Sequence, residues 1–205
     1  MSQKKLQGKV AIVTAATKGI GEAIAERLAQ DGAKVVISSR RQDNVDETVG
    51  RLKKLGLTVA GIVCHVGNAA DRAKLIDFTL STFGRIDILV NNAGINPHFG
   101  HILDISEEVW DKLFDVNVKA AFMLCKLVVP HMEKVGGGSI VFNASIGGYK
   151  PPTGIATYGV TKTTLLGLTK ALAVSLVHQN IRVNGIAPGI IKTHMSRAVS
   201  PSQNS

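Results

Sequence analysis

The sequence is poor in aromatic residues and has no long apolar run. Phe, Trp and Tyr make up 4% of its 205 residues, and the basic residues are scattered without aromatics between them. This pattern argues against a nucleic-acid-binding surface. No run reaches the length that crosses a bilayer, and the N-terminus lacks the apolar stretch of a secretory signal. We therefore expect no nucleic-acid partner, no transmembrane segment and a cytoplasmic location.

Cysteine and acidic residues are also few. Cys64 and Cys125 each lie inside an apolar segment, which favours buried, reduced thiols over a disulfide. No Cys or His residues have zinc-site spacing, so no metal is expected. The 15 acidic residues against 24 Lys and Arg give a formal net charge of +9. A basic surface that attracts an anionic small molecule explains this charge most simply.

Short β-branched segments alternate with segments of helical period. The expected strands are Val10–Val13, Lys34–Ile37, Val59–Val63, Ile86–Val90, Ser139–Ala144 and Ile181–Ile186. The expected helices cover residues 23–29, 44–55, 70–83, one long helix from 106 to about 135, and 158–176. This alternation predicts an α/β fold with one Rossmann-type domain over residues 1–205. Its doubly wound parallel sheet has the order 3-2-1-4-5-6 in a three-layer α/β/α arrangement. Residues 195–205 are expected to form a frayed tail.

A glycine-bearing turn, from Thr14 to Gly21, joins the first strand to the first helix. In a dinucleotide fold, backbone N–H groups of such a turn and the helix N-terminus hold a pyrophosphate. Gly19 and Gly21 would allow close approach of the phosphates. Ala15 occupies the place of the first glycine of the usual fingerprint, so an ordinary strand–helix turn is the alternative.

The second strand ends in Ser39, Arg40 and Arg41. An acid at this position would bind the ribose of NAD, whereas a guanidinium pairs with a 2′-phosphate. The sequence therefore favours NADP(H) as cofactor. A solvated basic turn is the alternative.

The residues most indicative of chemistry lie between Ser145 and Lys162. Tyr158 and Lys162 are four apart, so on a helix they share one face. An ammonium beside a phenol favours the phenolate and would bring the pKa of Tyr158 towards neutrality. Ser145 follows a strand and would supply a second hydroxyl to the same reacting oxygen. A Tyr-x-x-x-Lys pair alone also occurs on ordinary helix surfaces, so the succession of strand, loop and helix carries this interpretation.

Other polar groups accompany these residues. Asn91–Gly94 follows a strand directly, at the edge where α/β sheets bind ligands. Asn117 lies among apolar residues and needs hydrogen-bond partners; a structural link to the loop after the fourth strand and a functional role are both open. His98 and His101 are interpreted as surface histidines without a catalytic part.

Together these motifs resemble the short-chain dehydrogenase/reductase superfamily, and within it the NADP(H)-dependent carbonyl and retinal reductases. The resemblance implies a small carbonyl or alcohol substrate and a hydride from NADPH. It implies that Tyr158 protonates the carbonyl oxygen, Lys162 lowers the pKa of Tyr158 and holds the nicotinamide ribose, and Ser145 polarises the carbonyl. Asn117 would hold a proton-relaying water. The implied cofactor-binding residues are Thr14, Ala15, Thr17, Lys18, Gly19, Ile20, Gly21, Ser39, Arg40, Arg41, His65, Val66, Asn92, Ala93, Gly94, Tyr158, Lys162, Pro188, Gly189, Ile191 and Thr193.

The resemblance also implies features that this sequence does not contain. Family members continue beyond Thr193 with a substrate lid, a further helix and a seventh edge strand, so we expect a sheet that lacks the seventh strand. A truncated, weakly active or inactive isoform that binds cofactor or partner subunits is the alternative function.

The resemblance to this family also predicts a homodimer or homotetramer formed through the helices of Asn117 and Leu165. The peroxisomal C-terminal tripeptide of this branch is absent; a peroxisomal or mitochondrial location, as in relatives, is the alternative to the cytoplasm.

Overall fold

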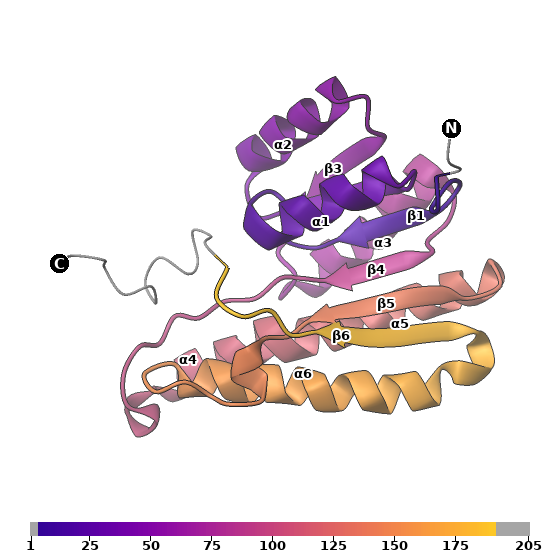
Figure 1. Cartoon of the computed structure of the whole chain (residues 1–205). Coiled ribbons are helices and arrows are strands. Elements are labelled where there is room, and N and C mark those ends of the chain that lie inside the picture. The colour runs from indigo at the N-terminus through magenta and orange to yellow at the C-terminus, as the bar shows by residue number, and fades with distance from the viewer. Residues whose placement is uncertain (1–3, 192–205) are drawn as a thin grey trace.

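The computed structural model describes residues 4–191, in which six strands alternate with helices (Figure 1). The strands are β1 (Val10–Val13), β2 (Lys34–Ser39), β3 (Val59–Val63), β4 (Ile88–Asn91), β5 (Gly138–Asn143) and β6 (Ile181–Ile186). The α-helices are α1 (Gly19–Gln30), α2 (Gln42–Lys54), α3 (Ala69–Phe83), α4 (Glu107–Phe114), α5 (Ala120–Lys134) and α6 (Ala156–Ser175). Short 3₁₀ turns cover Ile102–Asp104, Ile146–Gly148 and Val177–Gln179, and Asp115–Lys119 is π-helical.

All strand pairings are parallel, and the sheet order is β3-β2-β1-β4-β5-β6. The predicted order is therefore confirmed. The chain reverses its direction of winding between β1 and β4, and the carboxyl ends of all strands meet at one edge. Ligands of open α/β sheets bind at such a switch point, so the fold places Thr14 and Asn91 at the centre of that edge.

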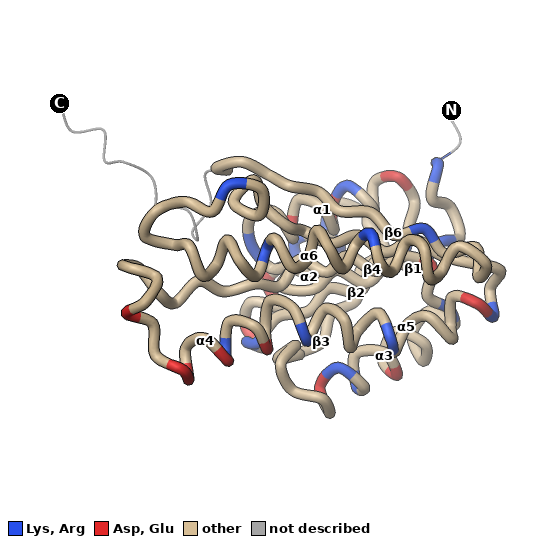
Figure 2. Tube along the Cα trace, turned by 90° about the horizontal axis from the view of Figure 1, so that it is seen from below, with Lys and Arg blue, Asp and Glu red and all other residues tan. Residues whose placement is uncertain are grey.

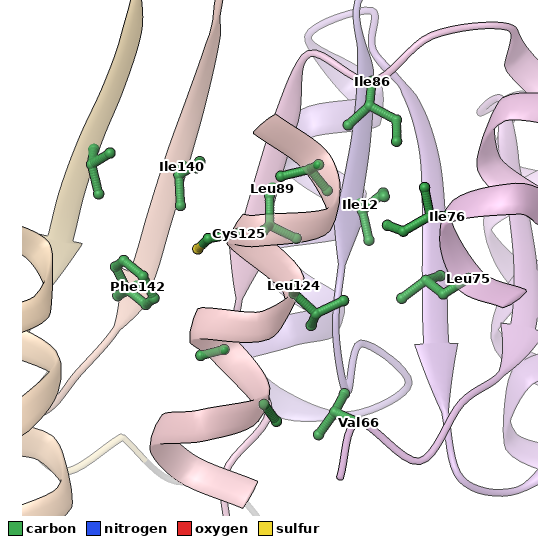
Figure 3. Close-up of a cluster of buried hydrophobic side chains, with 14 of the residues drawn as sticks. Ile12, Val66, Leu75, Ile76, Ile86, Leu89, Leu124, Cys125, Ile140 and Phe142 are labelled. Atoms are coloured by element: carbon green, nitrogen blue, oxygen red, sulfur yellow. The ribbon is translucent and has the colours of Figure 1, made fainter. Parts of the chain in front are cut away.

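Helices cover both faces of the sheet and give two apolar cores. Helices α1 and α2 pack on one face against residues such as Val13 and Val35, whereas α3, α5 and α6 pack on the other. Figure 3 shows this second core, where Leu124 and Cys125 of α5 lie near Leu89 and Phe142 of the sheet. Because alternate residues of each strand enter different cores, both faces must be apolar, which explains the nearly continuous apolar strands.

The amino-terminal end of the sheet is closed by an ion-pair network on Asp87. Its carboxylate accepts hydrogen bonds from Arg85 Nε and Nη2 at 2.8 and 2.6 Å, from Lys9 Nζ at 3.1 Å and from the N–H of Val10 at 2.9 Å. Burial raises the pKa of this carboxyl, but the hydrogen bonds outweigh burial and the net pKa is lowered. The network joins β1 to β4 at the end of the sheet remote from Ser145.

Two expectations about helices need correction. The predicted single helix from 106 to about 135 is α4 and α5 joined by the π-helical segment Asp115–Lys119, so its hydrogen-bond pattern changes around Asn117. Helix α1 begins at Gly19, four residues earlier than expected. Periodicity misses such starts because glycine contributes no apolar side chain to the pattern.

The predicted states of the cysteines and of the α6 leucines are confirmed. Cys64 and Cys125 are free and buried, and the α6 leucines belong to the core or pack against it. Along the Cα trace, Lys and Arg positions are spread over many elements and mixed with acidic ones (Figure 2). Among residues 4–191, no helix has the length and hydropathy needed to cross a membrane.

Candidate active site

The turn after β1 is held against the residues after β4. The hydroxyl of Thr14 accepts hydrogen bonds from the N–H groups of Asn92 and Ala93, both at 3.0 Å. Asn92 Nδ2 in return donates to the carbonyls of Thr14 at 2.9 Å and Ala15 at 3.1 Å. Ala15 has φ +50°, in the left-handed region that costs free energy for a residue with a Cβ. Asn92 thus stabilises a strained turn.

The first turn of α1 suits a phosphate. A Cβ at Gly21 would lie 2.4 Å from Asn92 Nδ2 and 2.6 Å from the Ala15 carbonyl, so only glycine fits. Lys18 precedes the helix and its side chain does not cap the first-turn N–H groups. Uncapped N–H groups, the positive end of the helix dipole and the Lys18 ammonium form an anion-binding set. Thr17 is buried, and its carbonyl accepts a hydrogen bond from Thr48 Oγ1 at 3.3 Å.

The two arginines after β2 differ in their surroundings. Arg41 Nε donates to Asp43 Oδ1 at 3.1 Å, and the two side chains also pair through Nη2. Arg40 is exposed and forms no ion pair within residues 4–191. Of the two guanidiniums, Arg40 is therefore available to a ligand phosphate beside Ser39.

His65 and Val66 lie at the same edge of the sheet, after β3. The Ser39 carbonyl accepts a hydrogen bond from the N–H of Cys64 at 2.8 Å, which places this loop next to the end of β2. The N–H of His65 donates to Asp71 Oδ2 at 2.9 Å, and Val66 is buried. The structure thus brings His65 and Val66 next to Ser39, as expected for residues that bind one cofactor.

Ser145 and Tyr158 meet across the loop between β5 and α6. Ser145 Oγ accepts a hydrogen bond from the N–H of Gly147 at 3.0 Å, and its hydroxyl is close enough to the phenol of Tyr158 to influence the pKa of that group. Burial raises the pKa of Tyr158, and the Ser145 hydroxyl lowers it by less. This differs from the expected lowering of that pKa by Lys162. In the protein alone, burial favours the protonated phenol, which is the form that can donate a proton.

Lys162 lies one helical turn from Tyr158, with Nζ 5.4 Å from the phenol ring centroid. Its side chain is 3% exposed, and Nζ donates to the carbonyl of Asn143 at 2.7 Å. Desolvation lowers the pKa of this ammonium to about 8. A buried lysine with a pKa near neutrality exchanges its proton readily.

The π-helical segment presents Asn117 to the same place. Asn117 Oδ1 accepts from the N–H of Ile95 at 2.8 Å, and Nδ2 donates to the Ile95 carbonyl and to Thr161 Oγ1, both at 3.0 Å. The predicted link to the loop after β4 is confirmed. A Cβ on Gly94 would lie 3.5 Å from both Asn117 Oδ1 and Lys162 Nζ, so the backbone after β4 lies directly beside these two side chains.

The residues after β6 complete the edge. The carbonyl of Pro188 accepts a hydrogen bond from the N–H of Ile146 at 3.0 Å, and Gly189 is exposed. Ile191 and Ile20 line an apolar groove along the start of α1. Thr193 lies outside the described residues.

Two residues of this site were missed from the sequence. Thr161 joins Asn117 to the Tyr158 carbonyl, to which its hydroxyl donates at 2.7 Å. Asn143 holds Lys162 through its backbone and donates from Nδ2 to Asn92 Oδ1 at 2.7 Å. The sequence pointed to them only by position. Thr161 is a polar residue directly before Lys162, and Asn143 is an amide two residues before Ser145.

The donor set fits a dinucleotide phosphate and a nicotinamide-bearing cofactor. Along the carboxyl edge of the sheet lie, in order, the exposed guanidinium of Arg40 after β2, the uncapped N–H groups at Gly19 after β1, and Gly94 beside Lys162. The described residues contain no group of three His, Cys, Asp or Glu side chains placed to hold a metal ion.

Comparison with known proteins supports this interpretation. The family model described as short chain dehydrogenase matches residues 9–204. The chain belongs to the short-chain dehydrogenase family. Dehydrogenase/reductase SDR family member 4 of Caenorhabditis elegans is 66% identical over 197 residues, covering 96% of this chain and 76% of that protein. The Homo sapiens protein of the same name is 58% identical over 192 residues, covering 94% and 69%. The relation to this branch, predicted from the motifs, is thereby confirmed.

Solved structures of the family agree with the fold. A 7α-hydroxysteroid dehydrogenase complexed with NADH and 7-oxo glycochenodeoxycholic acid superposes with TM-score 0.92 at 36% identity, covering 97% of this chain and 78% of that one. A 3-ketoacyl-(acyl-carrier-protein) reductase from Brucella melitensis, complexed with NADH, gives 0.89 at 33% identity, covering 93% and 79%. This family member therefore shares the six-stranded Rossmann-like architecture of NADH-binding oxidoreductases.

Proposed function

We propose that this chain is an NADP(H)-dependent oxidoreductase that reduces ketones or aldehydes to alcohols. The observation that carries the proposal is the convergence of Ser145, Tyr158 and Lys162 at the carboxyl edge of the sheet, next to Gly94. NADPH would supply the hydride that adds to the carbonyl carbon. The protein supplies placement of the carbonyl and the proton.

The residues have complementary tasks in that reaction. The Ser145 hydroxyl orients the carbonyl oxygen by a hydrogen bond. Tyr158, protonated because of burial, donates its proton to that oxygen as negative charge develops there. Lys162, with its pKa lowered to about 8, holds positive charge beside the resulting phenolate and can pass a proton on. Asn117, anchored at both of its amide atoms, fixes the wall of the site next to Lys162.

The test of the chemistry is Tyr158→Phe. This change keeps the ring and removes the proton donor, so NADPH oxidation with an aromatic ketone should fall at least about hundredfold, while NADPH binding measured by fluorescence stays within about twofold. Tyr149→Phe is the matched control, because it removes the same hydroxyl from an exposed tyrosine in the loop between β5 and α6. Retention of most turnover in Tyr158→Phe would reject the mechanism. A wild-type chain that binds NADPH but reduces no ketone or aldehyde would favour the cofactor-binding, weakly active alternative.

The preference for NADP(H) rests on Arg40. Arg40→Ser should raise KM for NADPH about tenfold or more and leave KM for NADH unchanged, because only NADPH carries the 2′-phosphate. Arg41→Ser should have a smaller effect, since Asp43 already engages that guanidinium. Equal effects on both cofactors, or a larger effect at Arg41, would contradict this assignment.

The proposal includes assembly into a homodimer or homotetramer through the helices of Asn117 and Leu165. Phe122 of α5 and Val174 of α6 are apolar and exposed, which supports this surface. Light scattering of the purified chain tests this assembly, and a monomer would refute it.

The cytoplasmic location remains a prediction, to be tested by imaging of the tagged chain.

A further inference from the structure

Asn143 occupies a junction at the carboxyl edge of the sheet. It is the last residue of β5 and is 7% exposed. Within β5, Ile140 and Phe142 enter the core under α5, whereas Val141 packs in the core on the α1 face. Since side chains alternate along a strand, Asn143 points to the α1 face, towards the turn after β1.

The backbone of Asn143 fixes the lysine of the site. Its carbonyl accepts the hydrogen bond from Lys162 Nζ at 2.7 Å. Lys162 forms no ion pair within the described part of the chain, so this carbonyl is the group that holds the buried ammonium. A displacement of this carbonyl would therefore displace the ammonium.

The side chain of Asn143 connects the same junction to the phosphate turn. Asn143 Nδ2 donates to Asn92 Oδ1 at 2.7 Å, and Asn92 Nδ2 donates to the carbonyls of Thr14 and Ala15. A continuous path of hydrogen bonds thus runs from the left-handed Ala15, through two amides, to the carbonyl that holds Lys162.

The amide at position 143 has a cost in folding stability. Asn143 Oδ1 is buried and has no hydrogen-bond partner among the residues that the structure describes. A leucine or valine at the end of β5 would leave no polar oxygen buried without a partner. What distinguishes the amide from these side chains is the hydrogen bond that it donates to Asn92. We propose that Asn143 is a positioning residue that couples the phosphate-binding turn after β1 to the placement of Lys162. The coupling to turnover rests on the proposed function; the coupling to the turn does not.

Asn143→Leu tests this coupling, because leucine has a similar size and no donor. We expect amide hydrogen exchange over residues 14–21 of the cofactor-free protein to accelerate about tenfold and NADPH affinity, measured by fluorescence, to fall by a similar factor. With turnover as the readout, kcat should fall about tenfold or more and KM for the carbonyl substrate should stay unchanged. The pH profile of kcat should shift upward, because a loosened Lys162 is better hydrated.

Ser38→Ala is the matched control. Ser38 is buried near the end of β2, and its Oγ also lacks a hydrogen-bond partner in the described part of the chain. Its backbone carbonyl accepts a hydrogen bond from the N–H of Ala16 at 3.0 Å. Ser38 therefore contacts the same turn through its backbone and not through a side-chain amide. Removal of its hydroxyl should change none of these measurements. Asn143→Ser, too short to reach Asn92, provides a second variant if the leucine variant does not fold.

Each outcome decides the inference. Wild-type exchange and NADPH affinity in Asn143→Leu or Asn143→Ser, or equal changes in Ser38→Ala, would overturn it. If the wild-type chain reduces no carbonyl substrate, the proposed function fails, but exchange and NADPH affinity still test the coupling.

Discussion

The two ends of the sheet use polar groups in opposite ways. At the amino end, both oxygens of buried Asp87 are paired with cations or a backbone N–H. At the carboxyl end, within residues 4–191, the buried Lys162 ammonium donates to a single backbone carbonyl, and Asn91 Oδ1 and Asn143 Oδ1 have no hydrogen-bond partner. The first arrangement stabilises the fold. The second keeps the pKa of a proton-exchanging group close to neutral pH, at some cost in stability.

The left-handed residues repeat the contrast. Asn180, which precedes β6 at the amino end, has φ +56° and its Nδ2 donates to the Gly136 carbonyl at 2.7 Å. Asparagine tolerates this conformation better than other residues with a Cβ. Ala15, at the carboxyl end, has no polar side chain of its own, and its turn depends on the hydrogen bond that Asn92 Nδ2 donates to its carbonyl. Strain and unpaired polar atoms thus gather where ligands bind.

The largest expected effect comes from Lys162→Met at the carboxyl end. Turnover should fall at least about hundredfold, since the ammonium beside Tyr158 is lost. Stability at pH 7 should rise by up to about 3 kcal/mol, because the folded pKa of about 8 lies below the ordinary 10.5 and protonation opposes folding. Wild-type stability should accordingly increase as pH rises from about 8 to 10.5, and the variant should lack this increase in urea titrations. A less stable variant at pH 7 would contradict the contrast.

Asp87→Asn tests the amino end. Breaking the network should lower the free energy of unfolding by about 2–4 kcal/mol, while kcat of the folded protein is unchanged. The folded pKa of Asp87 is lowered, so its contribution is present above the ordinary carboxyl pKa and is lost as pH falls through the folded value. The variant should therefore be less sensitive to acid than the wild type. Asp43→Asn, at an exposed pair, is the control and should leave stability unchanged.

The smallest effect is expected from Ala15→Gly. Relief of the left-handed strain should raise the unfolding free energy by about 1 kcal/mol in urea titrations. Asn180→Gly should give no gain, because it removes a hydrogen bond from a residue that suits its conformation. Equal gains at both positions would show that the two ends are strained alike.

The sequence was sufficient for the sheet order and for the residues whose spacing has a local meaning. Tyr158 and Lys162 share a helix, and Ser145 follows a strand, so periodicity located them. Asn143 could not be found in this way, because its role depends on β4 and β5 lying side by side, which brings Asn92 within reach.

Two other properties depend on tertiary structure. The pKa of Tyr158 is set by burial, which the one-turn spacing from Lys162 does not reveal. The sequence places Arg85 two residues before Asp87, but only the fold brings Lys9 to this acid from 78 residues away in sequence. The π-helical segment was missed because apolar periodicity does not distinguish a wider turn within a continuous helix.

That segment, Asp115–Lys119, also limits how the chain can change in length. A π turn accommodates one residue more than the α pattern requires, so deletion of a single residue there could be absorbed by a return to regular α geometry. Because a π turn holds one residue more for nearly the same rotation, the part N-terminal to the deletion would keep almost the same phase relative to α5, and Leu113 would stay buried. A second deletion would find no surplus residue and would rotate that part by about 100°, so this segment should tolerate the loss of one residue but not of two.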